Sequence, residues 1–286
     1  MDVYSLGRSG DFQGALDRIG DFETDRSAGR SDRLRAALLR GQVLHTTGRV
    51  EDAVVIYQRV LERLVEDPRT QSVCCVELLT AANFLGDLDL AELVAQRALQ
   101  LIRRQPEAAP STERIFVNYG ITWQLKNDHL TAVDWFRRAL RRLEDAVDLS
   151  AGNWDRTCGM AIAWYGLAKS YVTLGDMVKA RFAIEGINCD SSSRVVACLM
   201  ALAEWRLHHR LRAWDRAERW AAQAQAYAPD PFMRQEVLLA QALTAHAQGN
   251  HLRSREFVQQ LEQMPVRLAY EVRIALSALA WKNGPS

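Results

Sequence analysis

The chain has 286 residues, of which 48% are hydrophobic and 25% are charged, values that are ordinary for a folded globular protein and argue against a disordered one. Its 36 Lys and Arg residues nearly balance its 35 Asp and Glu residues, so the net charge of +1 gives no global attraction to nucleic acid or to an anionic membrane. The N-terminal sequence lacks the apolar run of a signal peptide, and no window reaches the ~18 apolar residues of a membrane span. We therefore expect a cytoplasmic protein with no membrane partner.

Residues 1–30 predict half of a helical hairpin. The apolar-periodic segment 12–19 is typical of the second helix of a repeat, and no good partner helix precedes it. Two interpretations stay open at this point. Either the segment is a short N-terminal cap, because terminal repeats are often atypical, or the chain is a fragment of a longer protein.

A short turn sequence recurs from this segment onward. It combines Gly or Asn with a polar connection and a small residue, as in GRVEDA (48–53), GDLDLA (86–91) and NDHLTA (127–132). The small residues recur at steps of 37 to 48 residues, at Ala15, Ala53, Ala91, Ala132, Ala180, Ala217 and Ser254. No alternating apolar and polar run predicts a strand. A period near forty therefore predicts six stacked helical hairpins in one all-α chain, with a first block at 31–147 and a second block at 157–265.

The connection at 145–159 between the two blocks is the longest in the chain, and it contains Trp154. It is either a tolerated surface insertion or a segment in which Trp154 anchors to a groove or to a partner.

The second block opens with AWYGLAKSYVTLGDMVKA (163–180), which resembles the tetratricopeptide repeat family. The family pattern is W-x2-L-G-x2-Y followed by A-x3-F. Trp164, Leu167, Ala168, Tyr171 and Ala180 match it, and other repeats match in part. The resemblance implies a right-handed superhelical solenoid of helix-turn-helix repeats, with repeats lengthened as in the sensor regions of large bacterial transcription activators and signalling ATPases. The small and aromatic residues in this stretch are then packing positions.

Two later features predict helix boundaries. Asp230 followed by Pro231 is typical of a helix start, with an N-cap acceptor and a proline at the first helical position. At the C-terminus, apolar residues form one stripe within 266–283, which predicts a helix that caps the solenoid.

No motif for catalysis or for a metal site is present, so we expect neither an enzyme nor a cofactor. His208 and His209 are adjacent, and His246 and His251 are five residues apart, spacings that suit no common ligand on one helical face. The five cysteines lack paired short spacings and are expected to be reduced. The run RRALRR (137–142) is expected to be a solvated convex face, which makes nucleic acid an unlikely partner.

Function is expected on the concave face formed by the first helix of each hairpin, because the family binds ligands there. Carrying the groove positions of the family over to this sequence gives a polar set rich in cations: Arg35, Gln42, His45, Asn83, Arg114, Asn118, Gln124, Tyr165, Lys169, Arg206 and His209. Arg and Lys beside amide side chains favour an acidic or C-terminal peptide segment. The sequence thus predicts a non-enzymatic, regulatory module that binds a protein or a peptide.

Three alternatives stay open. A small-molecule sensor would need a pocket lined by Trp154, Tyr165 and Trp123. An RNA-binding helical repeat protein would need cations and aromatic side chains repeating at one groove position. Self-association through a terminal or convex surface is the third.

Overall fold

The computed structural model describes residues 11–24, 27–64, 67–106, 112–145, 156–187 and 193–282, the side chains of 280–282 excepted. These residues form helices and turns, and no strand occurs among them. The all-α prediction is therefore confirmed. The helices are α2 (Phe12–Thr24), α3 (Arg30–Thr46), α4 (Val50–Arg63), α5 (Pro68–Leu85), α6 (Leu88–Arg104), α7 (Thr112–Leu125), α8 (His129–Asp145), α9 (Arg156–Leu174), α10 (Met177–Glu185), α11 (Arg194–Arg210), α12 (Trp214–Tyr227), α13 (Pro231–Ala247), α14 (His251–Glu262) and α15 (Tyr270–Lys282).

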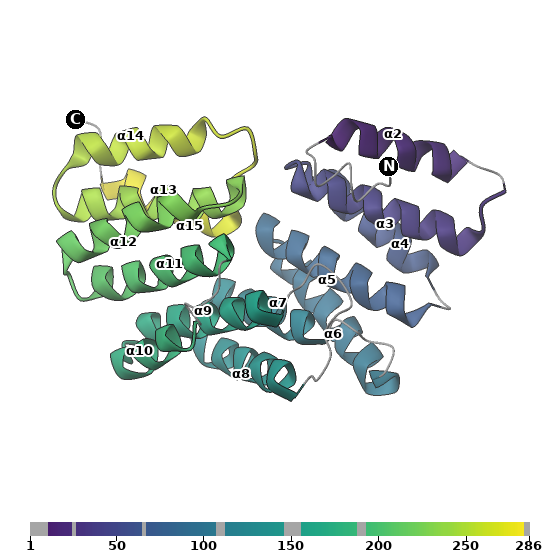
Figure 1. Ribbon diagram of the computed structural model, residues 1–286, viewed down its shortest axis with the longest axis horizontal. Coiled ribbons are helices and arrows are strands. Elements are labelled where there is room, and N and C mark those ends of the chain that lie inside the picture. The colour runs from purple at the N-terminus through teal and green to yellow at the C-terminus, as the bar shows by residue number, and fades with distance from the viewer. Residues whose placement is uncertain are drawn as a thin grey trace. The chain divides into compact units, whose positions relative to one another are not determined.

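Consecutive helices pair into hairpins. The pairs are α3 with α4, α5 with α6, α9 with α10, α11 with α12 and α13 with α14 (Figure 1). Helix α7 pairs with α8, where the ring of Phe116 lies against that of Trp135. The number of hairpins in the described ranges is the six that the repeat period predicts. We call the first member of each pair the first helix and the other the second helix.

The recurring turn residues have a common backbone conformation. Gly48, Gly86, Gly175 and Gly249 have φ values between 78° and 86°, in the left-handed region. Asn127 takes the same place with φ 61°, and Arg212 does so with φ 57°. Because a side chain is disfavoured at positive φ, this geometry explains why Gly or Asn recurs at the end of the first helices.

The second signal that recurs at the hairpins is an acidic or amide N-cap. Asp87 accepts a hydrogen bond from the amide of Leu90, and Asp230 accepts one from the amide of Met233 at 2.9 Å. Asp230 therefore caps α13, which begins at Pro231 as predicted.

Glycines allow the helices to cross closely over aromatic rings. A Cβ atom on Gly166 would lie 2.4 Å from the ring of Phe136, and one on Gly120 would lie 2.9 Å from the same ring. Phe136 and Ala180 have no exposed surface, and Ala168 is 1% exposed. The stretch around Trp164 thus packs the core, as the repeat motif predicts.

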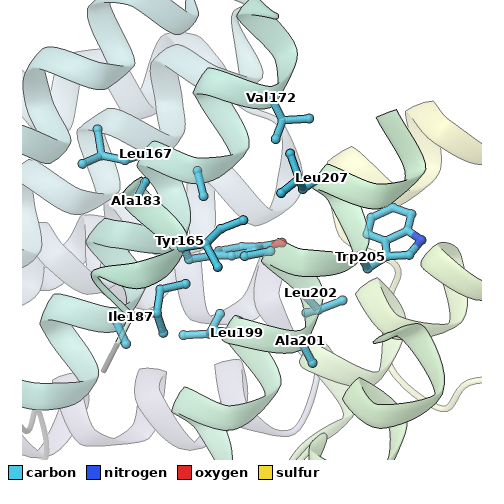
Figure 2. Packing of buried hydrophobic residues seen from close by; sticks show 14 of the residues in the cluster. Tyr165, Leu167, Val172, Ala183, Ile187, Leu199, Ala201, Leu202, Trp205 and Leu207 are labelled. Carbon is cyan, nitrogen blue, oxygen red and sulfur yellow. The ribbon is translucent and has the colours of Figure 1, made fainter. Parts of the chain in front are cut away.

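Contacts divide the chain into two compact units, Met1–Ile115 and Phe116–Ser286, and the division falls inside α7. In the first unit, Ala15 and Ile19 of α2 pack against Ala36 and Val43 of α3. In the second unit, one buried cluster runs from α7 to α13, and part of it is shown in Figure 2. None of the described helices is long and apolar enough to cross a membrane.

Candidate functional site

All the residues predicted for ligand binding lie on first helices. Their positions are α3 (Arg35, Gln42, His45), α5 (Asn83), α7 (Arg114, Asn118, Gln124), α9 (Tyr165, Lys169) and α11 (Arg206, His209). The structure distributes them between the two units, and each unit is described in turn.

In the first unit, Glu77 of α5 joins three first helices. Gln42 Nε2 on α3 and Arg114 Nη2 on α7 each donate to Glu77 Oε1 at 3.2 Å. The side chains of Glu77 and Arg114 are 13% and 24% exposed, so this pair is shielded from solvent. We call Gln42, Glu77 and Arg114 the Glu77 cluster.

The other predicted residues of α3 contact side chains outside that cluster. Arg35 Nη2 bonds Asp67 at 3.0 Å, and Asp67 also caps α5 through the amide of Thr70. The ring of His45 meets Phe84 edge to face. Burial lowers the pKa of His45, against an opposing attraction to Glu77, so His45 is neutral at pH 7.

The three predicted amide side chains are largely buried. Asn83, Asn118 and Gln124 are 5%, 7% and 8% exposed. Gln124 Nε2 donates to the carbonyl of Gly166 at 2.7 Å and to Ser170 Oγ at 2.8 Å, which ties α7 to α9. Gln124 therefore contributes to repeat stacking, and ligand binding by these three residues stays a prediction.

In the second unit, Tyr165 and Arg206 meet Glu236 of α13. Arg206 Nε donates to the Tyr165 hydroxyl at 3.0 Å and Nη2 donates to Glu236 Oε1 at 2.5 Å, while the hydroxyl donates to the same carboxylate oxygen. Figure 2 shows the Tyr165 hydroxyl directed from α9 toward the segment that carries Leu202 and Trp205. Burial raises the pKa of Tyr165 well above 10, so the hydroxyl stays protonated and can donate.

Glu271 of α15 completes this network. Its carboxylate bonds Lys169 Nζ and lies 3.4 Å from Arg206 Nη2. Burial would raise the pKa of Glu271, but Lys169 and Arg206 outweigh it and lower the pKa to about 2. We call Tyr165, Lys169, Arg206, Glu236 and Glu271 the Glu271 cluster. With two cations and two carboxylates, it carries no net charge.

His209 lies between two indole rings. Its ring centroid is 5.4 Å from that of Trp205 and 5.1 Å from that of Trp214. Burial is the largest cause that lowers the pKa of His209, so the ring is neutral at pH 7 and packs as an aromatic group.

The carboxylates Glu77, Glu236 and Glu271 are the members of the two clusters that the sequence analysis missed. The groove positions of the family favoured the cations, and nothing in the spacing shows which acids face them. For Glu236 a signal was available, because it lies on α13, which is the first helix of the hairpin after the one that contains Arg206. For Glu271 none was available, since its contact with α9 depends on the placement of α15.

Two expectations about histidine and cysteine can be compared with the structure. The rings of His246 and His251 approach to a centroid distance of 5.1 Å, although their spacing suits no single helical face. The two residues lie on α13 and α14, on either side of the turn at Gly249, so their rings meet across the turn and not on one helical face. In the described ranges no group of three or more His, Cys, Asp or Glu could hold a metal ion. Burial raises the pKa of Cys75 to about 11 and that of Cys198 to about 12.

The residues proposed for a small-molecule pocket are not gathered around one in the described part of the chain. Trp154 lies outside the described residues. Trp123 packs against Tyr119, with Lys126 over its ring, and the hydroxyl of Tyr165 is bonded within the Glu271 cluster. A pocket of about 60 Å³ lies instead among α12, α13 and α14, well below the ~300 Å³ of typical ligand sites.

No protein-family model and no curated protein matches the sequence. Solved structures do resemble this one. A tetratricopeptide repeat protein from Parabacteroides merdae has a TM-score of 0.63 at 14% identity, over 96% of this chain and 94% of that one.

Two other solved structures contain bound molecules. The Rap conjugation gene regulator of plasmid pLS20, in complex with the Phr* peptide, has a TM-score of 0.66 at 13% identity, over 99% of this chain and 73% of that one. The human IFIT1 dimer with m7Gppp-AAAA has a TM-score of 0.56 at 18% identity, over 92% of this chain and 58% of that one. At such low identities these likenesses establish architecture. The chain therefore has the fold of the tetratricopeptide repeat proteins, as the motif around Trp164 predicts.

Proposed function

We propose that this protein is a non-enzymatic, cytoplasmic scaffold whose first helices bind a segment of a partner protein. The observation that carries the proposal is the pair of polar clusters. Each cluster joins side chains from successive first helices, through α3, α5 and α7 in one unit and through α9, α11 and α13 in the other, where α15 also takes part. Binding surfaces of this kind are held in place before the partner arrives, which reduces the entropy lost on binding.

The chemistry of the clusters suits a peptide. They contain donors and acceptors in fixed positions, and an extended peptide presents alternating N–H and C=O groups as well as charged side chains. Lys169 and Arg206 would form charge-assisted hydrogen bonds with acidic side chains of the partner. The Rap regulator, which has the same architecture and was solved with a peptide, supports a peptide ligand and a regulatory role.

An RNA ligand is the competing proposal, because IFIT1 was solved with m7Gppp-AAAA. RNA binding depends on cations that neutralise phosphates. In the two clusters Arg114, Lys169 and Arg206 are each paired with a carboxylate, so the local positive potential is small. The peptide proposal fits these pairs better.

The proposal can be tested by affinity capture from an extract of the source cells, treated with ribonuclease. The test variant is Thr173→Arg with Arg210→Glu, at exposed ends of the first helices α9 and α11 and outside both clusters. The matched control is Val178→Arg with Arg181→Glu, at exposed positions of the second helix α10. Both pairs of changes leave the net charge lower by one, and circular dichroism checks that both variants fold.

We expect the unaltered protein and the control to retain the same partner and the test variant to lose it. Equal retention by all three proteins would contradict binding on the first helices. If only the control variant lost the captured partner, binding would be on the second helices. Saturable binding of a capped oligoribonucleotide, abolished only in the test variant, would replace the peptide with RNA.

A further inference from the structure

Helix α15 packs against the last hairpin and also contacts the first helices of two earlier hairpins. Its Val272 and Leu279 are 4% and 6% exposed, and Val272 packs with Leu238, Leu239 and Leu261 of α13 and α14. From this position its first turn carries Glu271 to Lys169 on α9 and to Arg206 on α11. A contact that reaches back across two hairpins exceeds what capping a helix stack requires.

The segment before α15 is fixed by a buried amide. Gln235 has no exposed surface, and its Nε2 donates to the carbonyl of Arg267 at 2.9 Å. Its Oε1 accepts from the amide of Ala269 at 2.9 Å. These two bonds hold the chain directly before Tyr270, so the start of α15 and the position of Glu271 are specified by the fold.

Exposure differs between the two sides of the ion pairs. The side chains of Lys169 and Arg206 are 13% and 18% exposed, whereas that of Glu271 is 39% exposed. Glu271 is therefore the member of these ion pairs whose side chain solvent reaches most. Without it, Glu236 alone would face two cations, and the cluster would carry a charge of +1. Cations left partly buried with one carboxylate are costly, so another anion would be favoured in that place.

We propose that Lys169 and Arg206 form a carboxylate-binding subsite, that Glu271 is its internal ligand, and that a carboxylate of the partner segment replaces Glu271 on binding. This inference rests on the proposed function and defines the chemistry of one position in the partner. Exchange of one carboxylate for another conserves the charge-assisted hydrogen bonds, so the net cost is the release of the Glu271 side chain. The internal ligand lowers the apparent affinity for the partner by the fraction of molecules in which the subsite is free.

The experiment uses fluorescent peptides and the full chain. One probe is an acetylated, amidated peptide of four Gly-Glu repeats, and its control has four Gly-Gln repeats. A third probe has Gly-Gln repeats and a free C-terminal carboxylate, which separates side-chain carboxylates from a chain terminus. Fluorescence polarisation gives the affinity of each for the unaltered protein, for Glu271→Gln and for Glu262→Gln, an exposed α14 residue that changes the net charge equally.

We expect Glu271→Gln to bind a carboxylate probe about tenfold more tightly than the unaltered protein, and to bind the amide control no more tightly. Glu262→Gln should match the unaltered protein. Adding Lys169→Met to Glu271→Gln should remove the gain. Equal affinity of Glu271→Gln and the unaltered protein for both carboxylate probes would overturn the subsite.

A second measurement needs no variant. In the unaltered protein, a saturating carboxylate probe should shift the carboxyl carbon NMR signal of Glu271, because its side chain is released from Lys169 and Arg206. An unchanged Glu271 signal with the probe bound would also overturn the proposal. If the subsite fails while Thr173→Arg with Arg210→Glu still loses the captured partner, the proposed function stands without it. If that variant keeps the partner, the proposed function fails as well.

Discussion

At the scale of single residues, close packing of a ring against glycine is the most demanding feature of the core. Phe136 lies between Gly120 of its own hairpin and Gly166 of the next one, and neither glycine has room for a Cβ atom. Gly175 differs, because φ is 84° and no atom lies within 4 Å of the place a Cβ atom would take. The two glycines are therefore required for different reasons, packing in one case and backbone conformation in the other.

We predict that Gly166→Ala costs about 1–3 kcal/mol of unfolding free energy through overpacking, and that Gly175→Ala costs about 1 kcal/mol through its positive φ. Denaturant unfolding of a double-mutant cycle separates these causes. Phe136→Leu should relieve part of the Gly166→Ala cost and leave the Gly175→Ala cost unchanged. Additive effects in both cycles would refute the packing explanation.

A buried hydroxyl provides a second prediction at this scale. Tyr57 has no exposed surface, and its hydroxyl has no hydrogen-bond partner among the described residues. Tyr57→Phe should therefore leave the melting temperature unchanged or raise it, because no hydrogen bond is lost. The control is Tyr171→Phe, which removes the bond that the Tyr171 hydroxyl accepts from Arg137 at 2.9 Å and should cost about 1 kcal/mol. A large loss of stability in Tyr57→Phe would reveal a partner for that hydroxyl.

At the scale of elements, the attachment of α15 should depend on pH. Because Lys169 and Arg206 lower the pKa of Glu271 to about 2 from 4.5, its ion pairs stabilise the fold fully above about pH 4.5. That stabilisation is lost as the pH falls from 4.5 toward 2. Burial also lowers the pKa of nearby His129, so protonation of His129 opposes folding over a range that starts below pH 6.5.

Melting temperatures measured from pH 7 to pH 3 can isolate the carboxylate. We predict that the difference in melting temperature between the unaltered protein and Glu271→Gln is constant from pH 7 to pH 5 and shrinks below pH 4.5. Glu262→Gln, the exposed control, should show no such change. A difference that stays constant down to pH 3 would show that Glu271 is not paired in solution.

The elements also show what a sequence can predict. The turn residues and the Asp caps specify the hairpins locally, since positive φ and an N-cap acceptor need only a few neighbouring residues. The repeat period and the Trp164 motif then predict the architecture. The position of α15 depends on packing against α13 and α14 and on Gln235, contacts between residues about thirty apart in the chain, so its contact with α9 could not be read from local pattern.

At the scale of the whole molecule, the near balance of charge that gives a net charge of +1 is also seen locally, because the cations of the two clusters are paired with carboxylates. The cations predicted for ligand binding were identified from the groove positions of the repeat family, but the carboxylates that neutralise them lie on other helices. The predicted cationic surface is therefore two polar clusters of mixed charge. Under the proposed function, such a surface would select a partner by geometry and matched hydrogen bonds more than by long-range attraction.

The measurement that tests the central claim most directly is site-specific photo-crosslinking of the intact protein to its partner. A benzophenone amino acid is placed at Thr173, at the exposed end of the first helix α9, or at Val178, which is 81% exposed on the second helix α10. We predict that the partner crosslinks at position 173 and not at position 178, and that an excess of the partner segment as a peptide abolishes the crosslink. Crosslinking at position 178 alone would contradict binding on the first helices.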